Sequence, residues 1–81
     1  MDGFTLSLVA KALPIRAGKP IAIVHDNVAR QLGIFPLDRI EINNPKTKKK
    51  IIAIVDVTDS MVSAGEIGLF EDTINKLKVK D

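Results

Sequence analysis

The side chains of this chain that have the chemistry for catalysis are few and scattered, and His25 is the first to consider. It is the single imidazole among 81 residues, and imidazole is the side chain that titrates nearest neutral pH. It stands where an apolar run ends and a helical pattern begins, and spacing places no serine or cysteine beside it as a nucleophilic partner. We therefore interpret His25 as a helix cap or a surface residue, with a general base as the alternative.

Two aspartates and two glycines suggest a metal or phosphate site, but neither pair completes the pattern that such a site needs. Asp56 follows a strand pattern and Asp59 begins a turn, whereas a metal ion needs more ligands that converge. Gly18 and Gly65 belong to neither Gly-x-Gly-x-x-Gly nor Gly-x-x-x-x-Gly-Lys-Ser/Thr, and neither opens a helix directly. We expect turn roles for these residues, with positive φ angles at both glycines.

Four lysines occupy the five positions from Lys46 to Lys50, and such a cluster is able to contact phosphate groups. No aromatic residue accompanies them to stack on bases, and the net charge of the whole chain is only +2. A lysine-rich hairpin tip is also a common solvated ending that resists aggregation. We interpret the segment as a solvated loop and expect no nucleic-acid partner, with nucleic-acid contact as the alternative.

The composition predicts one small ordered domain. Apolar residues make up 46% of the chain, which is enough for a single core. The absence of cysteine excludes disulfides and thiolate metal sites and suits a reducing cytoplasm, where we expect the protein to be. No apolar run approaches membrane-spanning length, and the first residues lack the pattern of a signal peptide, so we expect no membrane partner.

Apolar periodicity and turn residues predict a mainly β chain with short helices. The first helix has Asp26 or Asn27 as its N-cap and Gly33 in a left-handed conformation after its last residue. Pro36 takes the second position of the turn that follows. The expected strands are residues 4–13, 21–24, 40–42, 51–57 and 67–70, with a polar hairpin loop over 43–50.

The chain also repeats itself once. Segments 8–24 and 55–70 each run from a strand through a polar loop with an Ala-Gly pair into a second strand. Further on, residues 71–79 align with residues 26–34, with Leu77 on Leu32, and this alignment predicts a second helix by analogy with the first. This analogy outweighs the alternation of lysines with apolar residues near the C-terminus, which by itself favours a strand.

Two units of strand, loop, strand, helix, turn and strand resemble the double-psi β-barrel, in which two interlocked halves form six strands. We expect one such domain over residues 1–81, with repeat 1 at about 4–43, a hairpin loop at 43–50 and repeat 2 at about 51–81. Because Asp81 aligns with Pro36, the counterpart of strand 38–42 falls after the last residue. The barrel is therefore expected to lack its last strand and to expose an edge that drives self-association.

Four segments of the sequence have a distinctive order of residues. They are Ile15-Arg-Ala-Gly-Lys-Pro-Ile21, the helix ending in Gln-Leu-Gly33, the Pro36-Leu-Asp-Arg-Ile40 turn and strand, and Ala53-Ile-Val-Asp-Val-Thr-Asp-Ser-Met-Val-Ser-Ala-Gly-Glu-Ile-Gly-Leu69. These segments resemble the archaeal AMP phosphorylases, which are relatives of thymidine phosphorylase in the nucleoside phosphorylase II group. Together they cover nearly the whole chain and correspond to the N-terminal domain of these enzymes. Leu37 and Lys78 depart from the pattern, since glycine is expected at both positions.

The resemblance implies that the intact enzyme converts a nucleoside 5′-monophosphate such as AMP and phosphate into a free base and ribose 1,5-bisphosphate. That family's catalytic residues lie in later domains, so the resemblance implies no catalytic, cofactor-binding or metal-binding residue here. The implied partners are the remainder of the parent enzyme and further copies in a homo-oligomer.

Two alternatives come from other classes of protein. One is a substrate- or peptide-binding N-domain barrel of the AAA ATPase type, and the other is a small dimeric DNA-binding regulator. The near-neutral charge balance disfavours the regulator.

Overall fold

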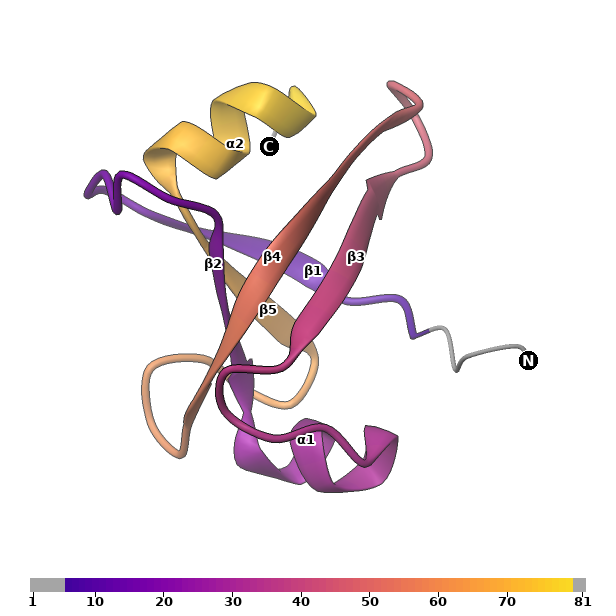
Figure 1. Cartoon of the computed structure of the whole chain (residues 1–81), viewed down its shortest axis with the longest axis vertical. Helices are drawn as coiled ribbons and strands as arrows, with labels where there is room; N and C mark the ends of the chain where they lie inside the picture. Colours follow the sequence, from indigo (N-terminus) through magenta and orange to yellow (C-terminus); the bar gives the residue numbers. More distant parts are fainter. Residues whose placement is uncertain (1–5, 80–81) are drawn as a thin grey trace.

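The structure, a computed structural model, describes residues 6–79 and contains a five-stranded sheet and two short helices (Figure 1). The helices lie at opposite ends of the sheet, with α1 below and α2 above in this view. The mainly β architecture predicted from the sequence is confirmed. In chain order the elements are β1 (Val9–Leu13), β2 (Ile21–His25), α1 (Asp26–Leu32), β3 (Arg39–Asn44), β4 (Lys49–Thr58), β5 (Glu66–Phe70) and α2 (Glu71–Leu77).

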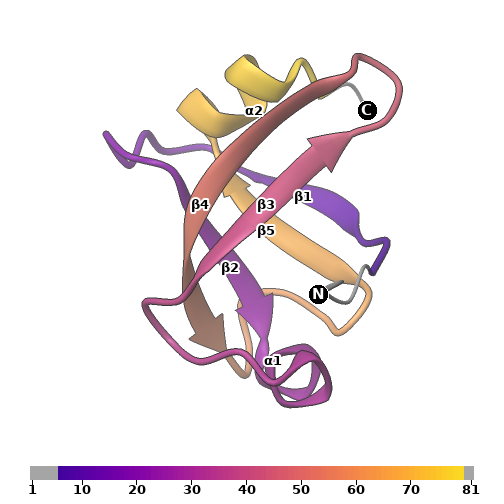
Figure 2. The ribbon, with the colours of Figure 1, turned by 45° about the vertical axis from the view of Figure 1, so that its right-hand side comes forward.

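The strand order β1-β5-β2-β4-β3 interlocks the two halves of the chain. β5 separates β1 from β2, and β2 separates β4 from β5, so each of these two connections skips a strand of the other half. β1 is parallel to β5 and β2 is parallel to β4, whereas β2–β5 and β3–β4 are antiparallel. The sheet coils strongly (Figure 2) but does not close among residues 6–79, and β1 and β3 are its edges.

β2 and β5 form the buried centre of the sheet because most of their residues are apolar. Each strand has three consecutive buried residues flanked by half-buried ones, which is typical of a strand covered on both faces. Ala22 and Ala53 are fully buried, and their small side chains let neighbouring strands and helices pack closely. The core cluster consists of Ala22, Val24, Ala29, Ala53, Val55, Ile67, Leu69 and Leu77.

The β3–β4 hairpin shows the alternation expected of a half-buried ladder. In β3, Ile40 and Ile42 pack against the core, while Arg39 and Glu41 are exposed on the other face. Residues Lys49 and Asn44 are paired at its tip, so the strands run further than the predicted 40–42 and 51–57. The predicted loop over 43–50 is therefore shortened to a four-residue turn, because Lys48 donates its N–H to the carbonyl of Asn44 at 2.9 Å.

Both helices end in a left-handed residue, as the repeat predicts. Gly33 has φ 71° after α1, and Lys78 has φ 57° after α2. A lysine in this conformation is strained relative to glycine, which explains why glycine is the residue expected at this position. The predicted N-cap of α1 was wrong, because His25 rather than Asp26 or Asn27 caps the helix.

The turn between α1 and β3 has the predicted geometry. The N–H of Asp38 donates to the carbonyl of Phe35 at 3.1 Å, which places Pro36 in the second position. Leu37 occupies the third position with φ 76°, where a type II turn favours glycine. The departure noted at Leu37 is thus a strained backbone that the neighbouring hydrogen bonds hold in place.

The internal repeat is confirmed by the register of the strands, and the spacing is 45 residues. The β1–β5 pair Val9↔Glu66 corresponds to the β4–β2 pair Ile54↔Ile21. Ile54 lies 45 residues after Val9, and Ile21 lies 45 residues before Glu66. The remaining pairs of both ladders obey the same rule. The two halves therefore share one backbone plan, related by an approximate twofold that passes through the β2–β5 ladder.

Two details of the predicted repeat are corrected by this register. The Ala-Gly pairs are 47 residues apart in sequence, so Gly18 and Gly65 are not equivalent. Gly18 has φ 79°, as expected, but Gly65 is absent from the positive-φ residues of the described chain, so the prediction for Gly65 was wrong. β1 begins at Val9 rather than at Phe4, and the first part of the predicted strand, residues 4–5, lies outside the described residues.

Gly68 is the glycine where an added methyl group would disturb the core. A Cβ built there lies 3.1 Å from Cγ1 of Val62, 3.3 Å from Cβ of Ile23 and 3.3 Å from Cδ1 of Leu13. We expect Gly68→Ala to lower the free energy of unfolding by about 1–3 kcal/mol, because these three neighbours come from different segments. Urea denaturation measures the change.

Gly65→Ala is the matched control, because a Cβ at Gly65 meets nothing within 4 Å and the residue has an ordinary φ angle. The Gly65→Ala substitution should leave the midpoint of urea denaturation nearly unchanged. Equal destabilisation by both substitutions would contradict the packing described around Gly68.

Candidate functional site

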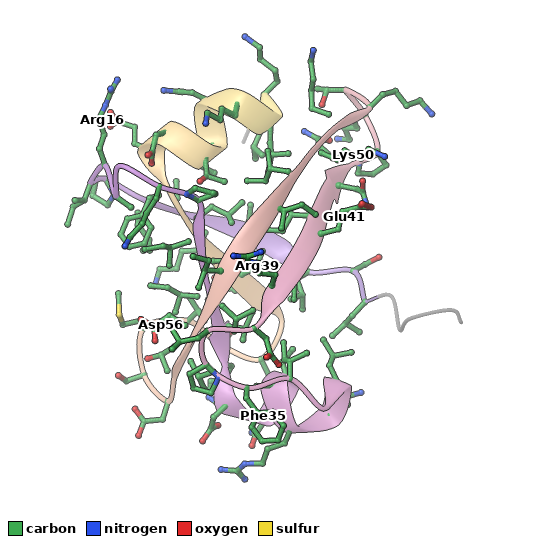
Figure 3. All side chains as sticks on the ribbon, in the orientation of Figure 1. Arg16, Phe35, Arg39, Glu41, Lys50 and Asp56 are labelled. Carbon is green, nitrogen blue, oxygen red and sulfur yellow. The ribbon has the colours of Figure 1, made fainter. Side chains whose placement is uncertain are left out.

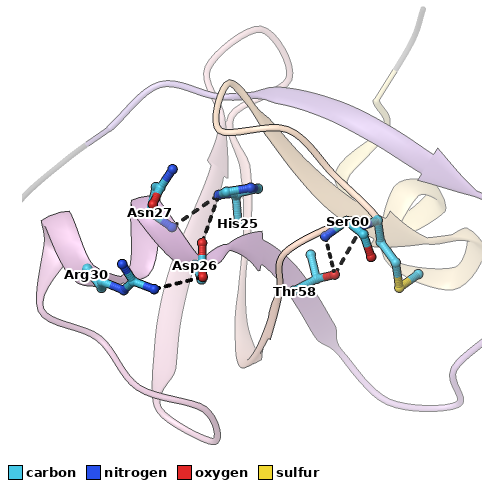
Figure 4. Close-up of polar contacts among 7 residues, drawn as sticks. His25, Asp26, Asn27, Arg30, Thr58 and Ser60 are labelled. Atoms are coloured by element: carbon cyan, nitrogen blue, oxygen red, sulfur yellow. Dashed lines mark hydrogen bonds and ion pairs between the residues drawn. The ribbon is translucent and has the colours of Figure 1, made fainter.

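His25 is built into the start of α1 and acts as its N-cap. Its Nδ1 accepts a hydrogen bond from the N–H of Asn27 at 3.1 Å (Figure 4). Nδ1 also lies 3.3 Å from Oδ1 of Asp26, but an atom that accepts from Asn27 has no proton to donate to that carboxylate. Asp26 is instead held by Arg30, whose Nη2 is 2.9 Å from Oδ2. The interpretation of His25 as a helix cap is confirmed.

The hydroxyl of Thr58, the residue paired with His25 in the sheet, is engaged in a turn. Thr58 pairs with His25 across the parallel β2–β4 ladder. Its Oγ1 accepts hydrogen bonds from the N–H groups of Ser60 and Met61, at 3.2 and 3.1 Å (Figure 4). This geometry closes the first turn of the β4–β5 loop and aligns no hydroxyl with the imidazole for proton transfer.

The two candidate metal-binding aspartates are likewise separate. Asp56 lies in β4, and its Oδ1 accepts a hydrogen bond from the N–H of the next residue, Val57, at 2.9 Å. Asp59 is exposed in the loop that follows. No group of three or more possible metal ligands occurs within residues 6–79.

The β1–β2 loop is held by a carboxylate from the start of α2. Oδ2 of Asp72 accepts the N–H of Gly18 at 3.1 Å, and Oδ1 lies 3.4 Å from the N–H of Ala17. Desolvation raises the pKa of Asp72, but its hydrogen bonds from the backbone N–H groups of four residues outweigh that effect and leave the pKa below its usual value of 3.8. The N–H of Gly18 therefore donates a hydrogen bond to a carboxylate of this chain and not to a bound phosphate.

The β4–β5 loop uses a second carboxylate for the same purpose. Oε1 of Glu66 accepts the N–H of Ser63 at 3.0 Å, and the N–H of Glu66 donates back to the carbonyl of Ser63 at 3.1 Å. The backbone hydrogen bond from Ser63 is the main reason that the pKa of Glu66 lies below its usual value. Nζ of Lys11 ties the loop to β1 through the carbonyl of Met61 at 2.8 Å.

The lysine-rich hairpin tip has a structural contact that the sequence did not suggest. Nδ2 of Asn44 donates to the carbonyl of Leu77 at 2.9 Å, and Oγ1 of Thr47 donates to the same carbonyl at 3.0 Å. The tip therefore caps the C-terminus of α2, so the lysines of both segments belong to the end of the molecule where Figure 1 shows α2 and the β3–β4 tip. These lysines are Lys46, Lys48, Lys49, Lys50, Lys76 and Lys78.

Apolar side chains are exposed at the opposite end, on the α1–β3 turn. Phe35 is 70% exposed and Leu37 is 81% exposed, and Figure 3 shows Phe35 beside α1. Leu37 also lines a shallow cleft of about 240 Å³. That volume is smaller than that of typical small-molecule sites. The cleft is lined by Lys19, Ile21, Pro36, Leu37, Ile54, Val55 and Asp56.

No profile of a known protein family matches this chain. Individual proteins do, and they carry the name AMP phosphorylase. The protein from Methanocella arvoryzae is 32% identical over 91% of this chain, and that from Methanococcoides burtonii is 34% identical over 83%. A third, from Natronomonas pharaonis, is 35% identical over 78% of the chain. The resemblance to AMP phosphorylases is therefore confirmed.

The matched region is a domain-sized part of these relatives. The chain spans 14% of the Methanocella protein and 13% of the Methanococcoides protein. These relatives do not favour the alternative of an ATPase N-domain. Within residues 6–79, neither helix is long and apolar enough to cross a membrane.

The contact between Asp72 and the β1–β2 loop predicts a pH-dependent effect on stability. The folded pKa of Asp72 is depressed, so its contribution is present above the usual value of 3.8 and is lost as pH falls through the folded pKa. Asp72→Asn should lower the urea midpoint at pH 7, because an amide NH₂ group then faces backbone donors. The difference in urea midpoint between the Asp72→Asn variant and the unsubstituted chain should become smaller in acid.

The matched control is Glu71→Gln, at the neighbouring position. It removes only a contact of 3.3 Å with Arg16 between side chains that are 52% and 71% exposed. A much smaller change is expected. The role assigned to Asp72 would be contradicted if both substitutions had the same effect, or if the gap caused by Asp72→Asn stayed constant at low pH.

Proposed function

We propose that residues 1–81 form the N-terminal accessory and assembly domain of an AMP phosphorylase. In this proposal the intact enzyme converts a nucleoside 5′-monophosphate and phosphate into a free base and ribose 1,5-bisphosphate, in the cytoplasm. The observation that carries the proposal is the similarity of this chain to proteins named AMP phosphorylase, which extends over up to 91% of the chain. The chain spans only 14% of the relative for which this coverage is reached.

The polar side chains support an accessory role rather than a catalytic one. His25 caps a helix, Thr58 closes a turn, and Asp72 and Glu66 hold loop amides. No buried side-chain nitrogen or oxygen in the described part of the chain lacks a hydrogen-bond partner. A catalytic site needs groups that are free to meet a substrate, and these side chains are engaged within the fold. Catalytic, cofactor-binding and metal-binding residues are therefore assigned to other domains of the enzyme.

The topology supports a double-psi arrangement as the fold of this domain. Two connections that each skip a strand of the other half, and two equivalent parallel ladders, are the features that this assignment uses. The domain covers residues 1–81, with repeats at about 4–43 and 51–81 joined by the hairpin at 43–50.

Exposed apolar side chains support the proposed assembly role. Phe35, Leu37 and Ile15 are each more than 60% exposed, and aromatic and aliphatic anchors of this kind are typical of protein interfaces. In this proposal they contact the remainder of the parent enzyme or further copies in a homo-oligomer.

The proposal predicts activity in the intact polypeptide and none in the isolated domain. The complete reading frame should encode phosphate-dependent release of adenine from AMP, measured by chromatography. The 81-residue chain at the same concentration should release none, because no catalytic group is assigned to it. Phosphorolysis by the isolated chain, or an intact protein inactive toward every nucleoside monophosphate, would contradict the proposal.

The assembly role has its own measurement. Removal of residues 1–81 from the intact protein should reduce the sedimentation coefficient by more than the lost mass explains. The double substitution Phe35→Ser and Leu37→Ser tests the exposed turn, with Lys46→Ser and Lys49→Ser as a control at the far end. An unchanged oligomer after removal of the domain would overturn the assembly role alone.

A further inference from the structure

Six exposed lysines gather where the β3–β4 tip meets the C-terminus of α2, at one end of the molecule (Figure 1, Figure 2). The two segments are held together by Asn44 and Thr47, which donate to the carbonyl of Leu77 at 2.9 and 3.0 Å. The sequence by itself favours a solvated loop over nucleic-acid contact, but it shows only the lysines of the tip together. This surface is called the lysine end, and its members are Lys46, Lys48, Lys49, Lys50, Lys76 and Lys78.

The lysine end has no balancing acid of its own. Residues 43–50 and 73–79 contain neither aspartate nor glutamate, and the acids of α2 lie in its first turn, at the other end of the helix. None of the ion pairs found in the described part of the chain includes a member of the lysine end. The six charges therefore create a field of one sign, which attracts an anionic partner.

Two of the six lysines occupy strained backbone positions. Lys48 has φ 64° and Lys78 has φ 57°, and together with Leu37 they are the non-glycine residues with positive φ in the described chain. Glycine adopts this conformation without steric cost, so a lysine at either position costs stability. A helix C-terminus gains from a nearby cation, but that gain requires no lysine in the tip turn. Cations that are kept at strained positions indicate a use for the amines outside the fold.

The residue types of the lysine end favour a phosphate backbone as the partner. Bidentate recognition of carboxylates is typical of arginine, and residues 43–50 and 73–79 contain none. They also contain no aromatic side chain to stack on exposed bases. The tip has no large apolar side chain to insert into a membrane. A double helix presents closely spaced phosphates while its bases stay stacked, so it needs only the point charges that lysines supply.

We propose that the lysine end binds the phosphate backbone of double-helical nucleic acid without reading the base sequence. The tip and the end of α2 act as one surface, because Asn44 and Thr47 hold them together. Contact of about four lysines with phosphates gives a slope of about −3.6 for the logarithm of the binding constant against the logarithm of salt concentration. The inference goes beyond the proposed function and does not depend on it.

Fluorescence anisotropy with labelled DNA and RNA duplexes of mixed sequence measures the binding directly. Affinity should be similar for unrelated sequences and should fall about 100-fold between about 50 and 200 mM salt. No binding of either duplex at the lower salt concentration would overturn the proposal. Tighter binding to a single strand with the same number of phosphates, or to vesicles of phosphatidylserine, would also overturn it.

Charge removal tests whether both segments belong to the surface. Lys48→Gln with Lys49→Gln removes two charges from the tip, and Lys76→Gln with Lys78→Gln removes two from α2. Each double variant should weaken binding and make the salt slope less steep by about two.

The matched control removes two positive charges elsewhere, by Lys19→Gln with Arg39→Gln. Figure 3 shows Arg39 at the middle of the sheet, away from the tip. The salt slope should stay nearly unchanged in this control. An equal loss of binding in all three double variants would show an effect of net charge alone and would contradict a local surface.

Glycine at the strained positions separates binding from stability. Lys48→Gly with Lys78→Gly should raise the midpoint of urea denaturation, because the strain is relieved, and should weaken duplex binding. Lys46→Gln with Lys76→Gln, at positions without positive φ, should weaken binding without raising the midpoint. Lysines that serve the fold alone would give the opposite result for the glycine variant, with a lower midpoint and unchanged binding.

The joint between the segments has a test that keeps every lysine. Asn44→Ala with Thr47→Val removes the side-chain donors to the carbonyl of Leu77 and releases the tip from α2. Binding should weaken several-fold, since two linked groups of contacts bind more tightly than separate ones. Circular dichroism checks that the variant is folded, and unchanged affinity in the folded variant would overturn the single surface.

The intact polypeptide distinguishes this inference from the proposed function. The lysine variants should lose duplex binding there and keep phosphate-dependent release of adenine from AMP. Failure of the phosphorolysis assay with duplex binding intact would contradict the proposed function alone. Duplex binding by the 81-residue chain but not by the intact polypeptide would overturn the present proposal and leave the assignment to an AMP phosphorylase untouched.

Discussion

The antiparallel ladder between β2 and β5 is the interaction on which the rest of this structure depends. It joins the two halves of the chain at the approximate twofold, through the pairs Ala22↔Leu69, Ile23↔Gly68 and Val24↔Ile67. Each strand of this ladder is flanked on its other side by a parallel strand from the opposite half. Neither half therefore has a complete sheet of its own, and burial of the central apolar strands requires both halves to fold together.

This constraint accounts for the use of polar groups around the sheet. Interlocking the halves sends two seven-residue loops, residues 14–20 and 59–65, across the ends of the sheet, and their backbone amides need partners. Asp72 supplies acceptors to the first loop and Glu66 supplies them to the second. The carboxylates of Asp72 and Glu66 are thus engaged by the backbone that the topology exposes.

The same topology leaves other parts of the surface open to protein contact. The edge at β1 within residues 6–79 and the strained α1–β3 turn with Leu37 both cost stability or invite association. The proposed assembly role gives such features a use, and the chain spans only about a seventh of the relative from Methanocella arvoryzae.

Much of the fold was predictable from the sequence, because local patterns determine it. Apolar runs, the left-handed Gly33 and the Pro36 turn located most elements, and alignment of Leu32 with Leu77 found α2 where alternation alone favoured a strand. The particular residues of the segment 53–69 indicated the enzyme family, and apolar periodicity alone does not carry that information. Apart from the repeat, which relates Leu77 to a residue 45 positions away, these signals lie within a few residues of the features they predict.

What only the tertiary structure decided depends on contacts between distant residues. The strand register places Gly18 and Gly65 at different positions of their loops. Gly18 has a positive φ angle and donates its N–H to Asp72, whereas Gly65 is not among the positive-φ residues of the described chain. The capping of α2 by Asn44 and Thr47 joins residues that are 33 and 30 positions apart from Leu77. The position of β1 at the edge of the sheet within residues 6–79 likewise follows from pairing, because a strand's own residues do not specify which neighbours lie on either side of it.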